Sequence, residues 1–304
     1  MDYIIETKSL SKIYGRQKAL DNVSIHVPKG SIYGLIGSNG AGKTTILKII
    51  SGLAKQTDGT YELFGNSKAT PSANIGTLIE APGIYPKLSA MENMRIKCLT
   101  MGIKDKNLPA KLLEIVGLAD TGKKAAGKFS LGMKQRLGMA LALIGKPELV
   151  ILDEPINGLD PEGIIEVRDM ISRLNKEMNI TFIISSHILE ELSKIATNYG
   201  IIDKGRLLEE LDSETLFSKC NDRIEIGTND NENAIKVLTA YGVSDYKISE
   251  EGLINVFDQS DKSAEINSAL VKEGIAVHHL CVRNESLENY YISLIGGKAG
   301  SKNA

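Results

Sequence analysis

The chain has 304 residues, of which 42% are hydrophobic and 24% are charged, a composition typical of a folded protein with about two domains. Lys and Arg number 36 against 38 Asp and Glu, so the net charge of −2 leaves no cationic excess for a phosphate backbone, and we expect no nucleic-acid partner. The three cysteines are widely spaced, which matches neither a disulfide framework nor a zinc site.

Short apolar runs separated by turn residues over positions 1–36 predict a series of β-strands. Apolar residues at helical spacing over 43–53 predict a helix directly after a glycine-rich turn. Three helices are expected within about 88–145, which we interpret as an inserted helical lobe. Apolar runs at 149–152 and 181–184, separated by a helical stretch at about 161–178, are typical of buried parallel strands joined by a crossover helix. We therefore predict an α/β domain over residues 1–220.

The sequence changes character beyond residue 220. Its pattern predicts the order βαββαβ followed by a last helix, so we expect a ferredoxin-like α+β domain over 221–304. The adjacent His278 and His279 would point to opposite faces of a strand, and no metal site is expected there. The longest apolar runs fall far short of the roughly 18 residues of a membrane helix, and residues 1–10 contain no apolar targeting segment, so we expect no membrane span.

Residues 37–44 match the pattern G-x-x-x-x-G-K-[ST] and lie between a predicted strand and a predicted helix, which is the context that a phosphate-binding loop requires. Glycines let backbone N–H groups wrap the phosphates, the lysine pairs with the β- and γ-phosphates, and the hydroxyl after it binds Mg²⁺. The sequence therefore predicts an ATP site with Mg²⁺. Its expected residues are Gly37, Ser38, Asn39, Gly40, Ala41, Gly42, Lys43, Thr44 and Thr45.

A second motif ends the apolar run at 149–152 with two acids, Asp153 and Glu154. Asp153 is predicted to hold Mg²⁺ together with Thr44, and Glu154 to polarise the attacking water. Acids after an apolar run are common at any strand end, so this interpretation depends on the phosphate loop upstream.

Between the two motifs lies Phe129-Ser130-Leu131-Gly132-Met133-Lys134-Gln135-Arg136-Leu137, and after them come Gly158-Leu159-Asp160 and Ser185-Ser186-His187. This order resembles the ATP-binding subunits of ABC transporters over about residues 4–215. The resemblance implies a P-loop ABC ATPase cassette, with a RecA-like core, an antiparallel β portion and the inserted helical lobe.

The resemblance also implies roles for individual residues. Tyr14 would stack on adenine, His187 would contact the γ-phosphate, and Asp160 would lie in the D-loop. The signature residues Ser130, Gly132 and Gln135 would bind ATP held by the opposite subunit. Simpler roles remain open, because Tyr14 also suits an ordinary turn, His187 a strand end, and Ser130 a helix N-cap.

The sequence departs from the family at two positions. Leu131 stands where Ser or Gly is usual, and Glu80 stands where a glutamine is expected. A carboxylate can replace the amide as a Mg²⁺ ligand, but it adds negative charge beside Asp153 and Glu154, so hydrolysis is expected to be slower or coupled differently unless the change is neutral. Residues 79–86 and 130–136 resemble the branch that exports bacitracin-like and lantibiotic peptides.

One copy of each motif implies a second copy of the chain, or a close homologue, in a head-to-tail pair. The resemblance also implies separate transmembrane permease subunits and a cytoplasmic location on the inner face of the cell membrane. The alternative is a soluble ABC ATPase outside transport, but only 87 positions separate Lys43 from Ser130, which leaves no room for the long coiled coil of repair proteins. A P-loop kinase would not explain the signature.

Overall fold

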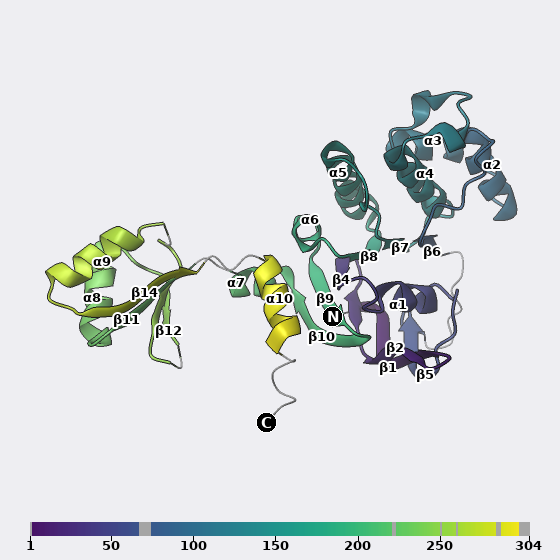
Figure 1. Ribbon diagram of the computed structural model, residues 1–304. Coiled ribbons are helices and arrows are strands. Elements are labelled where there is room, and N and C mark those ends of the chain that lie inside the picture. Colours follow the sequence, from purple (N-terminus) through teal and green to yellow (C-terminus); the bar gives the residue numbers. More distant parts are fainter. Residues whose placement is uncertain are drawn as a thin grey trace. The chain divides into compact units, whose positions relative to one another are not determined.

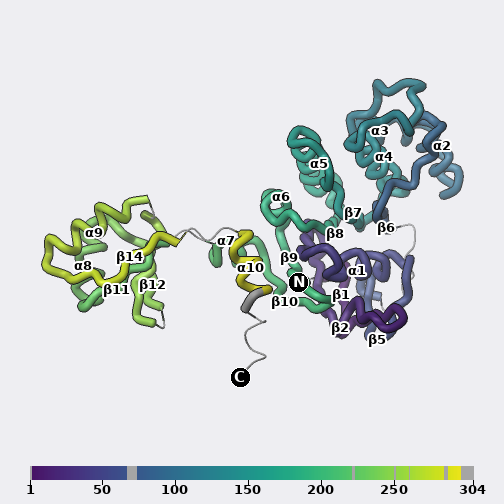
Figure 2. Tube along the Cα trace, viewed as in Figure 1, coloured from purple at the N-terminus to yellow at the C-terminus, as the bar shows by residue number. Residues whose placement is uncertain are grey.

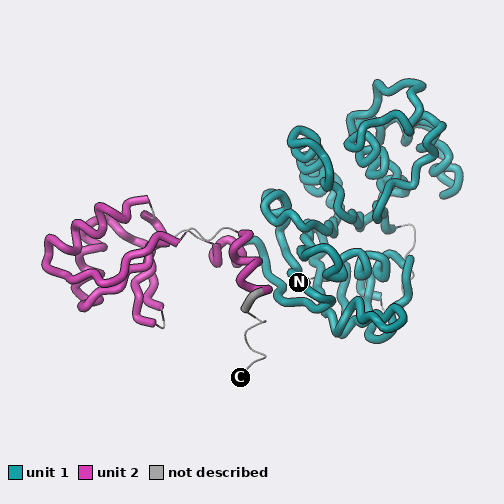
Figure 3. Tube along the Cα trace, in the orientation of Figure 1, with its two compact units in different colours: residues 1–213 teal, residues 214–304 magenta. Residues whose placement is uncertain are grey.

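The computed structural model describes residues 2–66, 74–220, 223–249, 251–259, 261–283 and 287–297. The chain divides into two compact units, Met1–Ser213 and Glu214–Ala304 (Figure 3). The sequence predicts a boundary at residue 220, whereas the structure divides the chain after Ser213. Most of the short helix α7 (Ser213–Lys219) therefore belongs to the second unit.

The first unit is built around a six-stranded sheet in the order β10-β9-β4-β8-β7-β6. Its neighbouring strands run parallel except for β10, which pairs antiparallel with β9. Every residue of β4, β7 and β8 is buried, as expected for central strands covered on both faces. The predicted α/β core with parallel strands is confirmed. The strands are β4 (Ile32–Ile36), β6 (Ile75–Leu78), β7 (Leu149–Asp153), β8 (Thr181–Ser186), β9 (Asn198–Asp203) and β10 (Arg206–Asp212).

A second, antiparallel sheet contains the order β2-β1-β3, with β5 also paired to β1. Figure 1 labels helix α1 (Lys43–Ile50). This helix buries Ile46, Leu47 and Ile49 in a core cluster shared with residues of both sheets. The N-terminal end of α1 is thereby fixed in position. The strands are β1 (Tyr3–Tyr14), β2 (Gln17–Val23), β3 (His26–Pro28) and β5 (Asp58–Leu63).

Three helices form a lobe on the polypeptide between β6 and β7: α2 (Ala90–Thr100), α3 (Leu108–Ile115) and α4 (Leu131–Leu143), with two single 3₁₀ turns at Ala119–Thr121 and Ala126–Lys128. Helix α2 begins with a capping box, in which Ser89 accepts a hydrogen bond from the Glu92 backbone and Glu92 accepts one from Ser89. Two more helices, α5 (Pro161–Met178) and α6 (Leu189–Ser193), follow β7 and β8.

The second unit contains a four-stranded antiparallel sheet in the order β12-β13-β11-β14. Figure 2 traces the path of the chain through this unit. The apolar side chains of its strands and of helices α8 and α9 share one buried cluster, so both helices pack against the sheet. Its elements are β11 (Arg223–Thr228), α8 (Asn231–Tyr241), β12 (Tyr246–Ile248), β13 (Ile254–Val256), α9 (Ser263–Lys272), β14 (Val277–Arg283) and α10 (Leu287–Gly297). In the described part of the chain, no helix combines the length and apolar character needed to cross a membrane.

Candidate nucleotide-binding site

The loop at residues 37–42 connects the end of β4 to the start of α1. Gly40 and Gly42 have φ angles of 82° and 109°, a left-handed conformation that favours glycine. A Cβ at Gly42 would lie only 2.8 Å from the carbonyl oxygen of Ala19, so the loop also needs glycine for close packing. The loop thus places its backbone N–H groups next to the N-terminus of a helix, which is a site for anions.

A cavity of about 540 Å³ opens over this loop. Tyr14 and residues 38–45 line it, as do Lys18, Glu154 and Lys204. The Tyr14 ring is half exposed, and Lys12 Nζ lies 4.7 Å from its centroid. The structure therefore brings together all the predicted nucleotide-binding residues except Gly37, which lies just outside the lining.

Lys43 is buried, with 5% of its surface exposed. Its Nζ donates to the carbonyl oxygens of Gly37 at 2.6 Å and Ser38 at 3.2 Å, and lies 3.1 Å from Glu154 Oε1. A buried ammonium group requires such partners, because an unpaired charge is costly away from water. A bound phosphate would offer Lys43 the same kind of partner that Glu154 supplies here.

Asp153, the last residue of β7, and the backbone of Glu154 are held by hydroxyl groups. Thr44 Oγ1 donates to Asp153 Oδ2 at 2.9 Å, and Ser185 Oγ donates to Asp153 Oδ1 at 2.5 Å. Ser185 Oγ also accepts a hydrogen bond of 2.9 Å from the backbone N–H of Glu154. Ser185 was not among the expected site residues, although it is the second-last residue of β8, and parallel strands end at a common edge.

Thr44 and Asp153 offer hard oxygen ligands within hydrogen-bond distance of each other, which suits Mg²⁺. In the described ranges, no group of three or more His, Cys, Asp or Glu side chains could hold a metal without other ligands. The residues present therefore fit an ion that is held jointly by the protein and by the oxygens of a nucleotide, as is usual for Mg²⁺.

Glu154 adopts a left-handed conformation, with a φ angle of 49°. One carboxylate oxygen pairs with Lys43, and the other lies 2.8 Å from His187 Nδ1. The contact orients the imidazole ring and the carboxylate toward each other. Glu154 and His187, expected to act on the γ-phosphate side of the site, are thus in direct contact.

Glu80 does not join the predicted metal ligands. Its carboxylate pairs with Lys48 of α1 at 2.5 Å, its side chain is 65% exposed, and it is not part of the cavity lining. The hydrogen bond to Glu80 raises the pKa of Lys48. Sequence reasoning missed Lys48, although it lies one helical turn after Thr44 and therefore on the same face of α1.

The signature and D-loop residues begin two neighbouring helices. Ser130 caps α4 by accepting a hydrogen bond from the Met133 N–H, and Asp160 caps α5 by accepting one from the Gly163 N–H. A Cβ at Gly132 would lie 3.7 Å from Leu159, which places the signature beside the D-loop.

None of the signature residues lines the cavity over the loop at 37–42. Gln135 is buried, and its Oε1 has no hydrogen-bond partner among the residues described. In this single chain the structure therefore keeps Gln135 away from the surface that was expected to reach a second ATP site.

Comparison with known proteins gives consistent matches. Residues 20–157 match the family described as ABC transporter. The chain is 44% identical to the bacitracin transport ATP-binding protein BcrA of Bacillus licheniformis, over 98% of this chain and 99% of that protein. It is 42% identical to the lantibiotic transport ATP-binding protein SrtF of Streptococcus pyogenes, over 73% of this chain and 97% of that protein. It also resembles the crystal structure of the ADP conformation of MJ1267, an ATP-binding cassette of an ABC transporter, with a TM-score of 0.64 and 26% identity over 72% of this chain and 96% of that one.

Proposed function

The chain belongs to the ABC transporter family and is an ATPase subunit that drives export, and we propose that its cargo is a peptide antibiotic. The family expected from the sequence motifs is confirmed. A soluble ABC ATPase outside transport is not favoured, because relatives that match along the full chain are transport ATP-binding proteins. The cargo is supported by residues 79–86 and 130–136, which resemble the bacitracin and lantibiotic branch, and by the names of these relatives.

One observation carries the catalytic part of the proposal: Lys43 and Glu154, which line the loop cavity, form a continuous chain of contacts with His187. The N–H groups of residues 38–45 would bind the phosphates, and Tyr14 would stack on the base. Lys43 would exchange its contact with Glu154 for the β- and γ-phosphates. That exchange would release one Glu154 oxygen to accept a proton from the attacking water, while His187 orients the carboxylate.

Thr44 and Asp153 would hold Mg²⁺, which would neutralise the charge that develops on the transferred phosphoryl group. Ser185 would keep Asp153 in place for this role by donating to its second oxygen. Glu80 would approach the ion only after leaving Lys48, because the two side chains form an ion pair.

We also propose that two copies of the chain pair head to tail. The signature residues Ser130 and Gly132 do not line the cavity of their own chain, so a second copy would be needed to place them on the phosphates. Gln135 would then support the start of α4 from its buried position and would not touch the nucleotide.

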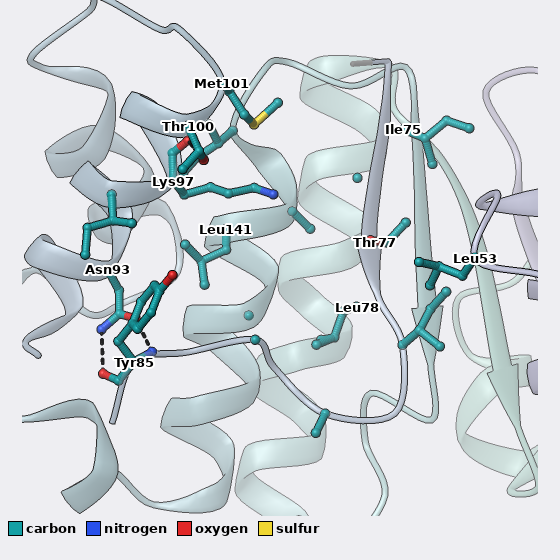
Figure 4. Close-up of a pocket in the computed structure, with 18 residues that line it drawn as sticks. Leu53, Ile75, Thr77, Leu78, Tyr85, Asn93, Lys97, Thr100, Met101 and Leu141 are labelled. Atoms are coloured by element: carbon teal, nitrogen blue, oxygen red, sulfur yellow. Dashed lines mark hydrogen bonds between the residues drawn. The ribbon is translucent and has the colours of Figure 1, made fainter. Parts of the chain in front are cut away.

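A groove of about 440 Å³ between the segment after β6 and the helical lobe would receive the permease (Figure 4). Leu53, Leu78 and Leu141 give it an apolar lining, while Asn93 accepts from the Tyr85 N–H at 2.6 Å and fixes its rim. It includes Ile79 and Ala81, which flank Glu80, so a membrane subunit seated here would lie beside the nucleotide site. This arrangement would place the chain on the cytoplasmic face of the cell membrane.

The second unit is proposed to be a ferredoxin-like domain. The element order βαββαβ, the strand order β12-β13-β11-β14 and the packing of α8 and α9 against the sheet support this assignment.

The transport assignment is tested by purifying the tagged chain from detergent-solubilised native membranes and measuring ATP turnover in the recovered material. We expect a multi-spanning membrane protein to co-purify. Recovery of an active ATPase that is reproducibly free of any membrane protein would contradict the assignment.

The cargo is tested in the native strain with Lys43→Ala, and with Lys176→Ala on the exposed part of α5 as the matched control. Lys43→Ala should abolish ATP binding and lower resistance to bacitracin or to a lantibiotic to the level of a strain without the gene, whereas the control should retain both. If deletion of the gene leaves resistance to both classes of peptide unchanged, the cargo is not a peptide antibiotic of these kinds.

A further inference from the structure

Helix α1 directs the side chains of Thr44 and Lys48, one helical turn apart, toward the carboxyl ends of β7 and β6. Thr44 donates a hydrogen bond to Asp153, the last residue of β7, and Lys48 pairs with Glu80, which follows β6. Residues four apart on a helix share a face, so the two contacts lie next to each other. Strands β6 and β7 are parallel neighbours, with Leu78 opposite Leu152, and Glu80 follows its last paired residue as Glu154 follows Leu152. The Lys48–Glu80 pair therefore borders the proposed metal and phosphate site.

The charges at this edge are nearly balanced. Asp153, Glu154 and Glu80 contribute three carboxylates, and Lys43 and Lys48 contribute two ammonium groups. Lys43 is buried, and its Nζ lies 3.1 Å from Glu154 Oε1, so Lys43 pairs with Glu154 and not with Glu80. Lys48 supplies the positive charge that faces the Glu80 carboxylate.

The Lys48–Glu80 ion pair can also separate at little cost in free energy. Lys48 and Glu80 are 31% and 65% exposed, and partly exposed ion pairs are weak, because water and salt screen them. Glu80 lies at a left-handed position, with a φ angle of 63°, which turns the chain away from the direction of β6.

We infer that Lys48 is the positioning residue for Glu80: it holds the carboxylate beside α1 and so lets a glutamate lie next to bound phosphates without repelling them. This inference rests on the proposed function of the site in binding ATP. Without Lys48, the Glu80 carboxylate would oppose the approach of the nucleotide, which carries negative charge of its own. With a neutral glutamine at position 80, Lys48 would have no negative charge to compensate, and its removal would not lower the affinity for the nucleotide.

The test is a double-mutant cycle on the full-length protein, read out as the affinity for a fluorescent ATP analogue with Mg²⁺ and, separately, with EDTA. Lys48→Met in the native background should weaken binding by about two- to fivefold, the range expected for an ion pair of this exposure. Lys48→Arg should retain native affinity. In the Glu80→Gln background, Lys48→Met should cause no further loss.

The dependence of the affinity loss on salt concentration distinguishes an electrostatic role of Lys48 from a structural one. The loss caused by Lys48→Met should shrink in 1 M NaCl, since screening at that ionic strength acts over about 3 Å. The thermal unfolding midpoint of each variant is measured in parallel, so that a loss of affinity in a destabilised protein is recognised.

An equal fold-loss from Lys48→Met in both backgrounds would overturn the inference, because Lys48 would then act on the nucleotide directly. Full retention of affinity by Lys48→Met in the native background would overturn it as well. Either result would leave the proposed function standing. Failure of the native protein to bind the analogue would instead contradict the proposed function and, with it, this inference.

Discussion

Two residues of the candidate site, Ser185 and Glu154, each contact two other site residues. Ser185 is fully buried, and its hydroxyl donates to Asp153 while it accepts from the Glu154 N–H. These two hydrogen bonds hold the Asp153 carboxylate and the Glu154 backbone in one arrangement. Glu154 has a similar double role, because its two oxygens contact Lys43 and His187.

A buried carboxylate in the second unit gives a pH-dependent prediction. Glu225 is 9% exposed and accepts hydrogen bonds from Arg223 at 2.9 Å and Arg283 at 3.0 Å. Burial raises the pKa of Glu225, but the bonds to Arg283 and Arg223 outweigh it, so the pKa lies below its ordinary value of 4.5. A depressed pKa contributes stability that is present above pH 4.5 and is lost as the pH falls through the lowered value.

We therefore expect the unfolding transition of the second unit to weaken below pH 4.5 in the native chain. Glu225→Gln should lower its stability at pH 7 by on the order of 2 kcal/mol, since it removes charge-assisted hydrogen bonds, and should flatten this part of the pH dependence. Thermal unfolding of the full chain between pH 3 and 7 measures both effects, with the exposed Glu265→Gln as control. An unchanged pH profile in Glu225→Gln would rule out this carboxylate as the cause.

At the scale of elements, two glycines let β6 lie directly against α4. A Cβ at Gly76 would be 2.2 Å from the carbonyl oxygen of Ala142, and one at Gly138 would be 2.9 Å from Leu78. Strand β6 and helix α4 each have a glycine, which has no side chain, where their backbones come close. This contact joins the helical lobe to the strand that leads to Glu80.

Gly76→Ala should force β6 and α4 apart and destabilise the first unit by about 1–3 kcal/mol, the usual range for overpacking. Because β6 leads to Glu80, ATP turnover should fall as well. Gly83→Ala is the matched control, since nothing lies within 4 Å of its added methyl group. Chemical denaturation with turnover measured in parallel checks the prediction, and equal stability of the two variants would contradict it.

The sequence predicted elements better than it predicted contacts. The helix after the phosphate loop and the helix at 161–178 follow from the spacing of apolar residues, which is a local signal. The pairing of Glu80 with Lys48 and the role of Ser185 depend on which residues meet across α1, β6, β7 and β8. The buried position of Gln135 likewise depends on the packing of the lobe, which one helix's pattern does not determine.

At the scale of the whole molecule, the two parts of the proposed composite nucleotide site lie in different places on the chain. Residues 38–45 of the loop and α1 line the cavity with Glu154, whereas Ser130 and Asp160 cap helices α4 and α5 outside it. Such a distribution explains how hydrolysis would be linked to movement: ATP would join two chains, and its cleavage would part them.

The most direct test of this account is the molar mass of the Glu154→Gln variant in the presence of ATP and Mg²⁺, measured by size-exclusion chromatography with light scattering. Without its proton acceptor the site should keep ATP intact, so the variant should elute at twice the monomer mass of 32.9 kDa and return to the monomer when ATP is removed. The double variant Lys43→Ala/Glu154→Gln should remain monomeric. A Glu154→Gln protein that binds ATP but stays monomeric, or that hydrolyses it at the native rate, would contradict the account.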